Sequence, residues 1–240
     1  MILYKYYPCN EYTFRALSEM GLWCSPASNM NDPFDCLGQL MKYEFVTKDD
    51  IQSINTNEDG FIECPLNIAK NAFFQLCKST ISSHCFCSLS KDPMNILMWS
   101  HYALSHRGIV VGIEIPKNAL NSLYKVIYKN NLPNLKDEYF LSLINPELIK
   151  ASKIKPMPIF KYLSIKTKDW KYEVEWRFWR GNESGYLRYG VENLKSIYFG
   201  LRCPEETKTL VKSILRGHGV SDNVYHNIRI ETDPEIRLTI

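Results

Sequence analysis

The sequence predicts an α+β fold, in which one domain, 1–240, has a mixed, mostly antiparallel sheet flanked by helices. Three observations support this class. Segments typical of strands and helices follow one another without the regular rhythm of a doubly wound parallel sheet. No internal repeat or low-complexity linker divides the chain. Its 240 residues, 45% of them hydrophobic, are enough to build one sizeable core.

Helices are predicted at several places, among them a short one from Lys48 and others at 65–80, 137–144 and 146–152. Asn10 can cap a helix that runs to about Met20, where Gly21 follows. Another helix is expected from Asn95 to His106. A further one starts after Pro204 and is closed by a glycine. Its inward-facing side chains are expected to be Leu210, Val211, Ile214 and Leu215.

Strand signals occur along the whole chain. They cover 2–7, 22–25, 85–89, 109–115, 125–128, 173–180, 195–199, 224–230 and 236–239. After a turn at 181–185, residues 187–189 are expected to return beside the strand 173–180. Residues 130–158 are predicted to be a helical insertion within the single domain.

The charge of the chain is nearly balanced but unevenly distributed. A net charge of +3 is too small to indicate nucleic-acid binding by itself. One stretch, Lys150 to Lys171, nevertheless carries many lysines against Asp169 alone. It is either a solvated loop and helix face or a surface that attracts phosphates.

The cysteines do not have the arrangement of a disulfide scaffold. The chain has eight cysteines but no C-x-x-C pair, and a domain of this length needs no covalent staples. Cys85 and Cys87 would share one face of a strand, but a zinc site needs more ligands. We therefore expect reduced, mostly buried thiols and no metal. Without a secretory signal or a long apolar run, a soluble, cytoplasmic protein with no membrane contact is expected.

A polar, bend-rich loop lies between apolar segments at 26–35. Asn and Asp side chains bond to nearby backbone in such loops, and Pro33 fixes a dihedral angle, so a capped turn is one interpretation. The other is a loop that brings Asn31, Asp32 or Asp35 to the hydroxyl groups of a ligand.

The segment Met98 to Ala103 mixes aromatic rings with a histidine. On a helix, Trp99 and Tyr102 share one side, and His101 lies on an adjacent one. Trp and Met are most often core residues in such a pattern. His101 is either a satisfied core histidine or a proton carrier, because histidine titrates near neutral pH.

The predicted strand 173–180 carries charge on one face. Glu173, Glu175 and Arg177 alternate with apolar Val174 and Trp176. An exposed ion pair between Glu175 and Arg177 is the structural interpretation. The functional interpretation is a carboxylate held by its neighbours that binds a hydroxyl or stabilises a developing cation. The glycine-rich phosphate and dinucleotide loops, the nucleophile elbow and the H-E-x-x-H zinc motif are absent from the sequence.

With these residues the sequence resembles the bacterial family called domain of unknown function 2971. The resemblance runs over nearly the full length, and that family implies no settled activity. A role as an accessory factor of bacteria and mobile elements, in phage defence or as a toxin, is what it implies. The segments that carry it are 3–6, 22–26, 31–35, 88–90, 98–103, 106–109, 170–177 and 197–200.

A weaker resemblance is to ADP-ribosyltransferases, which carry a His or Arg on a first strand, a Tyr or Ser on a second and a Glu, often Glu-x-Glu, on a later one. Lys5, then Ser25 or Ser88, then the Glu173-Val174-Glu175 segment fall in that order, although Lys5 is neither His nor Arg. This resemblance implies an ADP-ribosyltransferase-like fold and NAD as the substrate, without a metal.

The resemblance also implies roles for the candidate residues. Glu175 would stabilise the oxocarbenium ion formed when the nicotinamide–ribose bond breaks, with Glu173 and His101 as further catalytic candidates. Aromatic rings would stack on nicotinamide, and Lys5 or Arg177 would meet the pyrophosphate. The full set of substrate-binding candidates is Lys5, Ser25, Asn31, Asp32, Asp35, Ser88, Trp99, Tyr102 and Arg177.

Two other functions fit the same residues. In a nucleic-acid-processing effector, His101, Glu173 and Glu175 would act as acid and base while Lys150 to Lys171 hold phosphates. In a non-enzymatic ligand- or protein-binding module of a defence system, the aromatic residues would form a pocket, and a neutralising or sensor protein would be the partner. If Glu175 and His101 both point into the core, fully paired and with no cleft beside them, the binding module is favoured.

Overall fold

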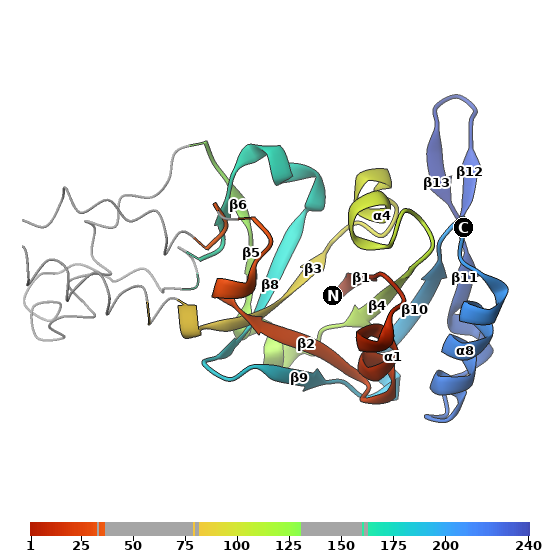
Figure 1. Ribbon diagram of the computed structural model, residues 1–240, viewed down its shortest axis with the longest axis horizontal. Coiled ribbons are helices and arrows are strands. Elements are labelled where there is room, and N and C mark those ends of the chain that lie inside the picture. The colour runs from red at the N-terminus through yellow and green to blue at the C-terminus, as the bar shows by residue number, and fades with distance from the viewer. Residues whose placement is uncertain (33, 37–78, 80–81, 131–159, 161–162) are drawn as a thin grey trace, which may run out of the picture. The chain divides into compact units, whose positions relative to one another are not determined.

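The computed structural model describes residues 1–32, 34–36, 79, 82–130, 160 and 163–240 (Figure 1). The chain divides into two compact units. Unit 1 comprises Met1–Ser25, Cys85–Val126 and Asp169–Ile240, and unit 2 comprises Pro26–His84 and Ile127–Lys168. The single-domain organisation stays a prediction. The helical insertion at 130–158 and the helices predicted from Lys48 and at 65–80 lie, apart from Ser79 and Asn130, outside the described residues.

Unit 1 is built around a nine-stranded sheet. Its main path runs β11-β10-β4-β1-β3-β2-β9, while β8 pairs with β3 and β5 pairs with β8. The β10–β11 pair is parallel, and the other pairs described in this sheet are antiparallel. The predicted mixed, mostly antiparallel α+β architecture is confirmed. The strands are β1 (Ile2–Tyr7), β2 (Gly21–Pro26), β3 (Cys85–Ser90), β4 (Ile109–Glu114), β5 (Leu123–Lys125), β8 (Glu175–Gly181), β9 (Gly185–Arg188), β10 (Leu194–Phe199) and β11 (Tyr225–Asn227).

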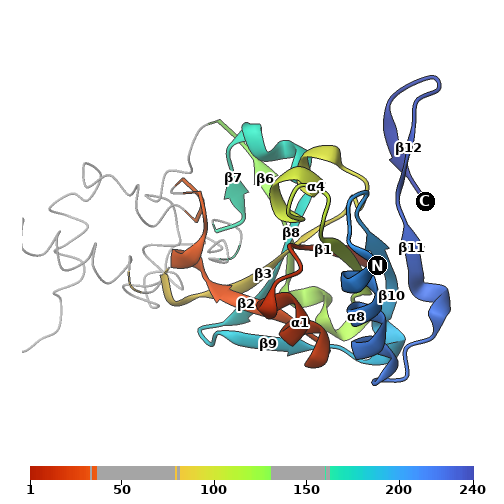
Figure 2. The same ribbon diagram turned by 45° about the vertical axis from the view of Figure 1, so that its right-hand side comes forward.

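Helices lie on both faces of this sheet (Figures 1 and 2). On the face that we call the α1 face, α1 (Glu11–Ser18) and α8 (Glu205–Arg216) bury Leu17 and Leu215 against the strands. On the opposite α4 face, α4 (Ile96–Tyr102) packs Met98 and Trp99 against Tyr6 and Val110. Because side chains alternate along each strand, every strand contributes to both faces.

The helix ends follow from capping. The Asn10 side chain accepts from the Thr13 amide at 3.1 Å, and Asn95 caps α4 by accepting from the Met98 amide at 3.1 Å. The inward orientation predicted for Leu210 is wrong, because its side chain is 45% exposed whereas Val211 and Leu215 are buried. Leucine at that position lies on the flank of the amphipathic helix.

The predicted helix 95–106 is too long. It ends at Tyr102, and Leu104, Ser105 and His106 have φ angles of 47°, 52° and 68°. Three successive residues in the left-handed region cannot continue a right-handed helix. Two glycines next to this turn leave no room for a side chain. A Cβ on Gly108 would lie 2.0 Å from the Tyr7 carbonyl oxygen, and one on Gly200 would lie 2.1 Å from that of His106.

The strand predicted to return beside 173–180 pairs elsewhere. Strand β9 pairs with β2, with Trp23 opposite Tyr186, rather than with β8. The turn at 181–185 is present, but the strand after it, β9, does not pair with the strand before it, β8. The predicted strand 173–180 itself starts at Glu175, because Glu173 ends the 3-10 helix η4 (Lys168–Glu173).

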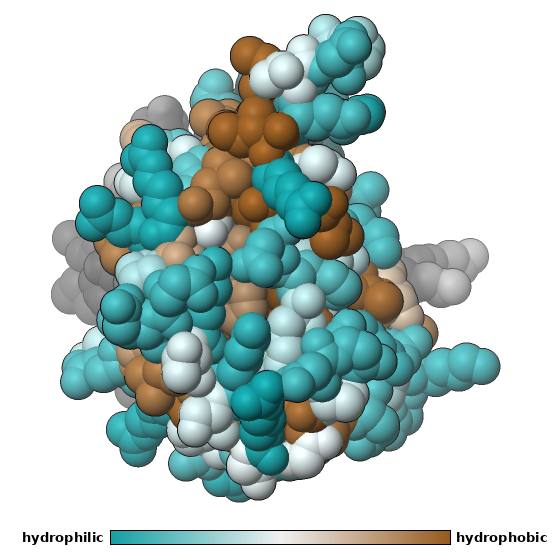
Figure 3. All heavy atoms as spheres, turned by 90° about the vertical axis from the view of Figure 1, so that its right-hand side faces the viewer, coloured by the Kyte–Doolittle hydropathy of each residue, from teal (hydrophilic) through white to brown (hydrophobic). Residues whose placement is uncertain are grey.

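The last strands form a separate two-stranded hairpin, β12 (Arg229–Glu231) with β13 (Arg237–Thr239), which projects beside β11 (Figure 1). Hydrophobic residues show at the top of this side of the molecule (Figure 3). In and next to the hairpin, the exposed large hydrophobic residues are Ile230, Ile236 and Ile240. Within the described part of the chain, no helix has the length and apolar character needed to cross a membrane.

Unit 2 is described over a few short elements. The 3-10 helix η1 (Ala27–Asn29) follows β2, and β6 (Ile127–Tyr128) pairs in parallel with β7 (Ile165–Lys166). The Ala27 amide donates to the His84 carbonyl oxygen at 2.8 Å, and the His84 ring contacts the Phe160 ring.

Candidate functional site

The most buried charges of unit 1 lie on β8. Arg177 Nε donates to Glu175 Oε1 at 2.9 Å, and Nη2 donates to Oε2 at 3.2 Å, so the pair is bidentate. The exposed fractions are 0% for Arg177 and 4% for Glu175. The two side chains meet because residues two apart on a strand point to the same face. The sequence interpretation as an exposed ion pair is therefore wrong about exposure, although the pair itself exists.

Strand β3 provides the surroundings of this pair. Ser88 lies opposite Arg177 and Ser90 opposite Glu175 in the antiparallel register. The Arg177 guanidinium carbon lies 4.6 Å from the centre of the Phe86 ring, within the range of a cation–π contact. Phe86 and Ser90 were not among the candidates, because only the register between β3 and β8 brings them to the charges.

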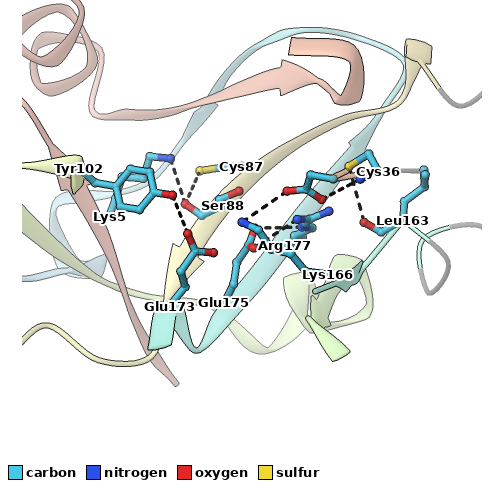
Figure 4. A network of polar contacts seen from close by, with 11 residues as sticks. Lys5, Cys36, Cys87, Ser88, Tyr102, Leu163, Lys166, Glu173, Glu175 and Arg177 are labelled. Carbon is cyan, nitrogen blue, oxygen red and sulfur yellow. Dashed lines mark hydrogen bonds and ion pairs between the residues drawn. The ribbon is translucent and has the colours of Figure 1, made fainter. Parts of the chain in front are cut away.

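A second carboxylate lies next to the first in sequence. Tyr102 Oη donates to Glu173 Oε1 at 2.6 Å, a short hydrogen bond to a carboxylate that is 4% exposed. Ser90 Oγ donates to the Glu173 carbonyl oxygen at 2.7 Å. The site thus takes side chains from the end of α4, the end of η4, and strands β3 and β8 (Figure 4).

The residue between the two carboxylates has an unusual backbone. Val174 has a φ angle of 45°, which is a clear outlier for a β-branched residue. Such a conformation costs on the order of 1–3 kcal/mol and persists only where the surrounding structure enforces it. The Val174 carbonyl oxygen accepts from the Lys91 amide at 3.1 Å, and its amide donates to the Lys171 carbonyl oxygen at 3.3 Å. Strain of this kind concentrates at functional sites.

Lys5 lies on a third strand, β1, but on the opposite face of the sheet from this site. It alternates with Tyr4 and Tyr6, which pack on the α4 face, so its side chain lies on the α1 face with Leu3 and Tyr7. Strands β1 and β3 pair at Tyr4 and Ser90, and Lys5 Nζ donates to the Ser88 carbonyl oxygen at 3.0 Å (Figure 4). Strands β1, β3 and β8 are therefore neighbours in the sheet and carry Lys5, Ser88 and Glu175. The three residues are on adjacent strands, but the Lys5 side chain does not share a face of the sheet with Ser88 and Glu175.

A row of rings extends from Tyr102. The His101 ring centre lies 6.3 Å from that of Tyr102 and 6.3 Å from that of Tyr172, and the Tyr172 and Trp170 rings are 6.1 Å apart. His101 is exposed, and the other three rings are half-buried. We call these four residues the aromatic row. His101 is thus not a core histidine, and Tyr102 links it to Glu173.

Trp99 and His106 take other places. Trp99 is fully buried, donates from Nε1 to the Pro93 carbonyl oxygen at 2.8 Å and packs edge-on against Tyr6, so it is a core residue here. His106 stacks on Trp99, and burial and the nearby Arg202 charge lower its pKa below the usual value. Its Nδ1 atom is buried and has no partner among the described residues.

The loop candidates belong to unit 2. Asp32 and Asp35 are buried, and each accepts from a backbone amide close by, that of Phe34 at 2.9 Å and that of Cys36 at 2.7 Å. This is the capped turn that the sequence allowed. Asp35 is also 3.5 Å from Lys166 Nζ, and both side chains are buried. Asn31 is exposed, and Ser25 on β2 is half-buried.

The structure describes part of the lysine-rich stretch. Lys166 is buried with Asp35, so it is not part of a phosphate-binding surface, whereas Lys168 and Lys171 are exposed. Residues 150–159 and 161 lie outside the described residues. Cys85 and Cys87 are buried thiols, and burial raises the pKa of both. Within the described ranges, no group of three or more His, Cys, Asp or Glu is placed to hold a metal ion.

The matched family segment covers most of this geometry. Residues 98–178 match the family model described as "Protein of unknown function (DUF2971)". The resemblance to DUF2971 is thereby confirmed over this segment. It contains the aromatic row, both glutamates and Arg177, so the DUF2971 match and the polar cluster coincide. No curated protein and no solved structure has significant similarity to the chain.

Proposed function

We propose that the protein is an ADP-ribosyltransferase-like enzyme that uses NAD as its substrate. The observation that supports this most is the carboxylate of Glu175 on β8, held through both oxygens by Arg177 and facing Ser90 of β3 in the sheet. A glutamate on a later strand is the part of the ADP-ribosyltransferase resemblance that this site retains, whereas the Lys5 side chain lies on the other face of the sheet. A phage-defence or toxin role follows from the resemblance to the DUF2971 family and belongs to the same proposal.

The reaction begins with cleavage of the bond between the nicotinamide nitrogen and ribose C1′. The bonding electron pair goes to the nitrogen, which neutralises the pyridinium ring and leaves an oxocarbenium ion on the ribose. A carboxylate that is already oriented stabilises this ion without reorganisation at the moment of reaction. Glu175 has that property, since both of its oxygens accept from Arg177.

The second carboxylate suits the transfer step. A nucleophile that attacks C1′ must lose a proton, and Glu173 accepts a hydrogen bond from Tyr102 at 2.6 Å. Glu173 takes this proton directly or through the Tyr102 hydroxyl, and exposed His101 passes it to solvent. The left-handed Val174 sets the direction of Glu173 relative to Glu175. The group that accepts the ADP-ribose is water or a macromolecule.

The test is release of nicotinamide from NAD by the pure protein, with and without nucleic acid and cell lysate. Glu175→Gln keeps the shape of the side chain but removes its charge, so we expect a loss of about 100-fold or more. Glu183→Gln is the matched control, since Glu183 is exposed in the turn after β8. Circular dichroism must show that Glu175→Gln is folded. Full turnover by folded Glu175→Gln would overturn the role of Glu175.

A second variant tests the same site without removing a charge. Tyr102→Phe deletes the hydroxyl that donates to Glu173 and leaves the ion pair on β8 intact. We expect kcat to fall about 100-fold or more while the fold is kept, because proton transfer by a positioned side chain typically contributes about 10²- to 10⁴-fold. No nicotinamide release by the wild-type protein under any of these conditions would overturn the enzymatic proposal.

One observation favours a non-enzymatic binding module as the second candidate. Glu175 and Arg177 are buried and paired with each other, as a structural ion pair would be. In that case the protein binds a ligand or a protein partner through the aromatic row and performs no chemistry. Absence of nicotinamide release, together with binding of a ligand that Tyr172→Ala abolishes, is the result expected for this candidate.

A further inference from the structure

We propose that the aromatic row, Trp170, Tyr172, His101 and Tyr102, binds the bases of single-stranded nucleic acid. The proposal does not depend on NAD chemistry, because it concerns binding through rings and lysines at the surface. It gives unit 1 a macromolecular partner that the proposed reaction does not require.

The rings of the aromatic row reach the surface. Large aromatic side chains of unit 1 such as Trp99 and Trp179 are buried in the core. Trp170 and Tyr172 are only half-buried, and His101 is exposed. Neighbouring ring centres lie 6.1–6.3 Å apart, so the four rings form a continuous series of π-faces and edges. Successive unpaired bases stack on such rings regardless of sequence, since every base has a π-face.

Positive charge lies beside the aromatic row. Lys171 stands between Trp170 and Tyr172 in sequence and is exposed. Lys91 is also exposed. Its amide donates to the Val174 carbonyl oxygen near the end of η4, while its Nζ donates to the Ile2 carbonyl oxygen at 3.2 Å. The nearby Glu173 is buried and accepts from Tyr102, whereas Asp169 is exposed. Aromatic rings interleaved with exposed lysines fit a chain of phosphates and bases.

The aromatic row fits single-stranded nucleic acid better than a duplex. Bases in a duplex are stacked on each other and offer only their edges, so a row of side-chain rings cannot stack on them without unpairing. The row lies on a short 3-10 helix and at the end of α4, not on a helix that projects into a groove. Single strands are therefore the partner that this surface fits.

The experiment measures binding of a labelled oligothymidylate to the full-length protein by fluorescence anisotropy, at low salt and without NAD. Trp170→Ala is expected to weaken binding roughly 5- to 150-fold, the range for loss of one base–aromatic stack. Trp23→Ala is the matched control, because Trp23 is another exposed tryptophan of unit 1, 46% exposed and in contact with Tyr186. The control is expected to change affinity by less than about twofold.

Charge and strandedness provide two further readouts. Lys171→Gln is expected to lower the dependence of log affinity on log salt by about 0.7, the value for one contact to a single-strand phosphate. The duplex of the same sequence is expected to bind more weakly than the single strand. Equal affinity of Trp170→Ala and wild type, tighter binding of the duplex, or no binding at low salt would each overturn the proposal. Because NAD is absent, these outcomes are independent of nicotinamide release.

Discussion

The two faces of the sheet in unit 1 are stabilised in different ways. The α1 face is apolar: Leu3, Val111 and Ile197 of the strands are buried against Leu17 of α1 and Leu215 of α8. The α4 face is apolar only around Trp99 and Val110. Near β3 and β8, the α4 face carries charge instead. The guanidinium of Arg177 and the carboxylates of Glu175 and Glu173 are buried there, on the side opposite Phe178 and Cys87.

The two faces therefore differ in how much they contribute to folding. Apolar burial stabilises at about 25 cal/mol per Å² of surface removed from water, so the α1 face contributes directly to folding. Buried charges must first lose their hydration, and an ion pair recovers this cost only when its geometry is good. Replacing a buried ion pair by hydrophobic side chains of similar volume is often neutral or stabilising, so folding alone does not require these charges. In the reaction proposed above they serve the chemistry instead.

The largest effect is expected from breaking the ion pair on β8. Arg177→Met leaves the Glu175 carboxylate buried without the Arg177 guanidinium. Glu175→Leu leaves the Arg177 guanidinium buried without the Glu175 carboxylate. Each single variant is expected to lose about 3–5 kcal/mol of unfolding free energy. The double variant Glu175→Leu/Arg177→Met removes both charges and should be more stable than either single variant, yet inactive. Urea unfolding of all four proteins measures this. A double variant whose loss equals the sum of the single losses would contradict the interpretation.

A smaller, purely structural effect is expected on the α1 face. Leu17→Ala removes a buried side chain between α1 and the sheet and is expected to cost about 2–5 kcal/mol, depending on how far the cavity closes. Because Leu17 lies on the face away from the charges, nicotinamide release per folded molecule should not change. The measurement combines thermal unfolding with activity at a temperature where the variant remains folded. Loss of activity in the folded state would show that the two faces are coupled.

The same comparison explains which parts of the molecule the sequence predicts. Apolar periodicity and caps gave β1, α1, β4 and α8 nearly to the residue, because local patterns decide these elements. The charged face was visible as Glu173, Glu175 and Arg177, but its burial was not. That burial arises from pairing with β3, which lies far away in the sequence, and from a ring, Phe86, that no local pattern connects to β8.

The element ends and the strand pairing that the sequence predicted wrongly depend on tertiary contacts. Val174 and the turn Leu104–His106 are in left-handed conformations that residues of these types rarely adopt. Tertiary contacts impose them, so the strand starts at Glu175 and α4 ends at Tyr102. The pairing of β9 with β2 instead of β8 is likewise a choice between long-range partners. Hairpin rules describe only the nearest neighbour in sequence.

The smallest expected effect is a pH dependence of stability from the α4 face. The pKa of His106 is lowered by burial and by Arg202 from its ordinary value of 6.5, and its Nδ1 atom has no partner among the described residues. Below about pH 6.5 the unfolded chain therefore binds more protons at this position than the folded chain. The contribution of neutral His106 is fully present above that pH and is lost as the pH falls through the folded pKa.

His106→Gln should flatten this part of the profile, whereas His218→Gln, at an exposed position after α8, should leave it unchanged. Urea unfolding at a series of pH values from about 7.5 down to about 5 measures the difference. An unchanged pH profile in His106→Gln would show that the proton uptake occurs elsewhere. A flattened profile would show that His106, stacked on Trp99, is a titrating group of the α4 face. The α1 face differs, because apolar packing against α1 and α8 dominates there.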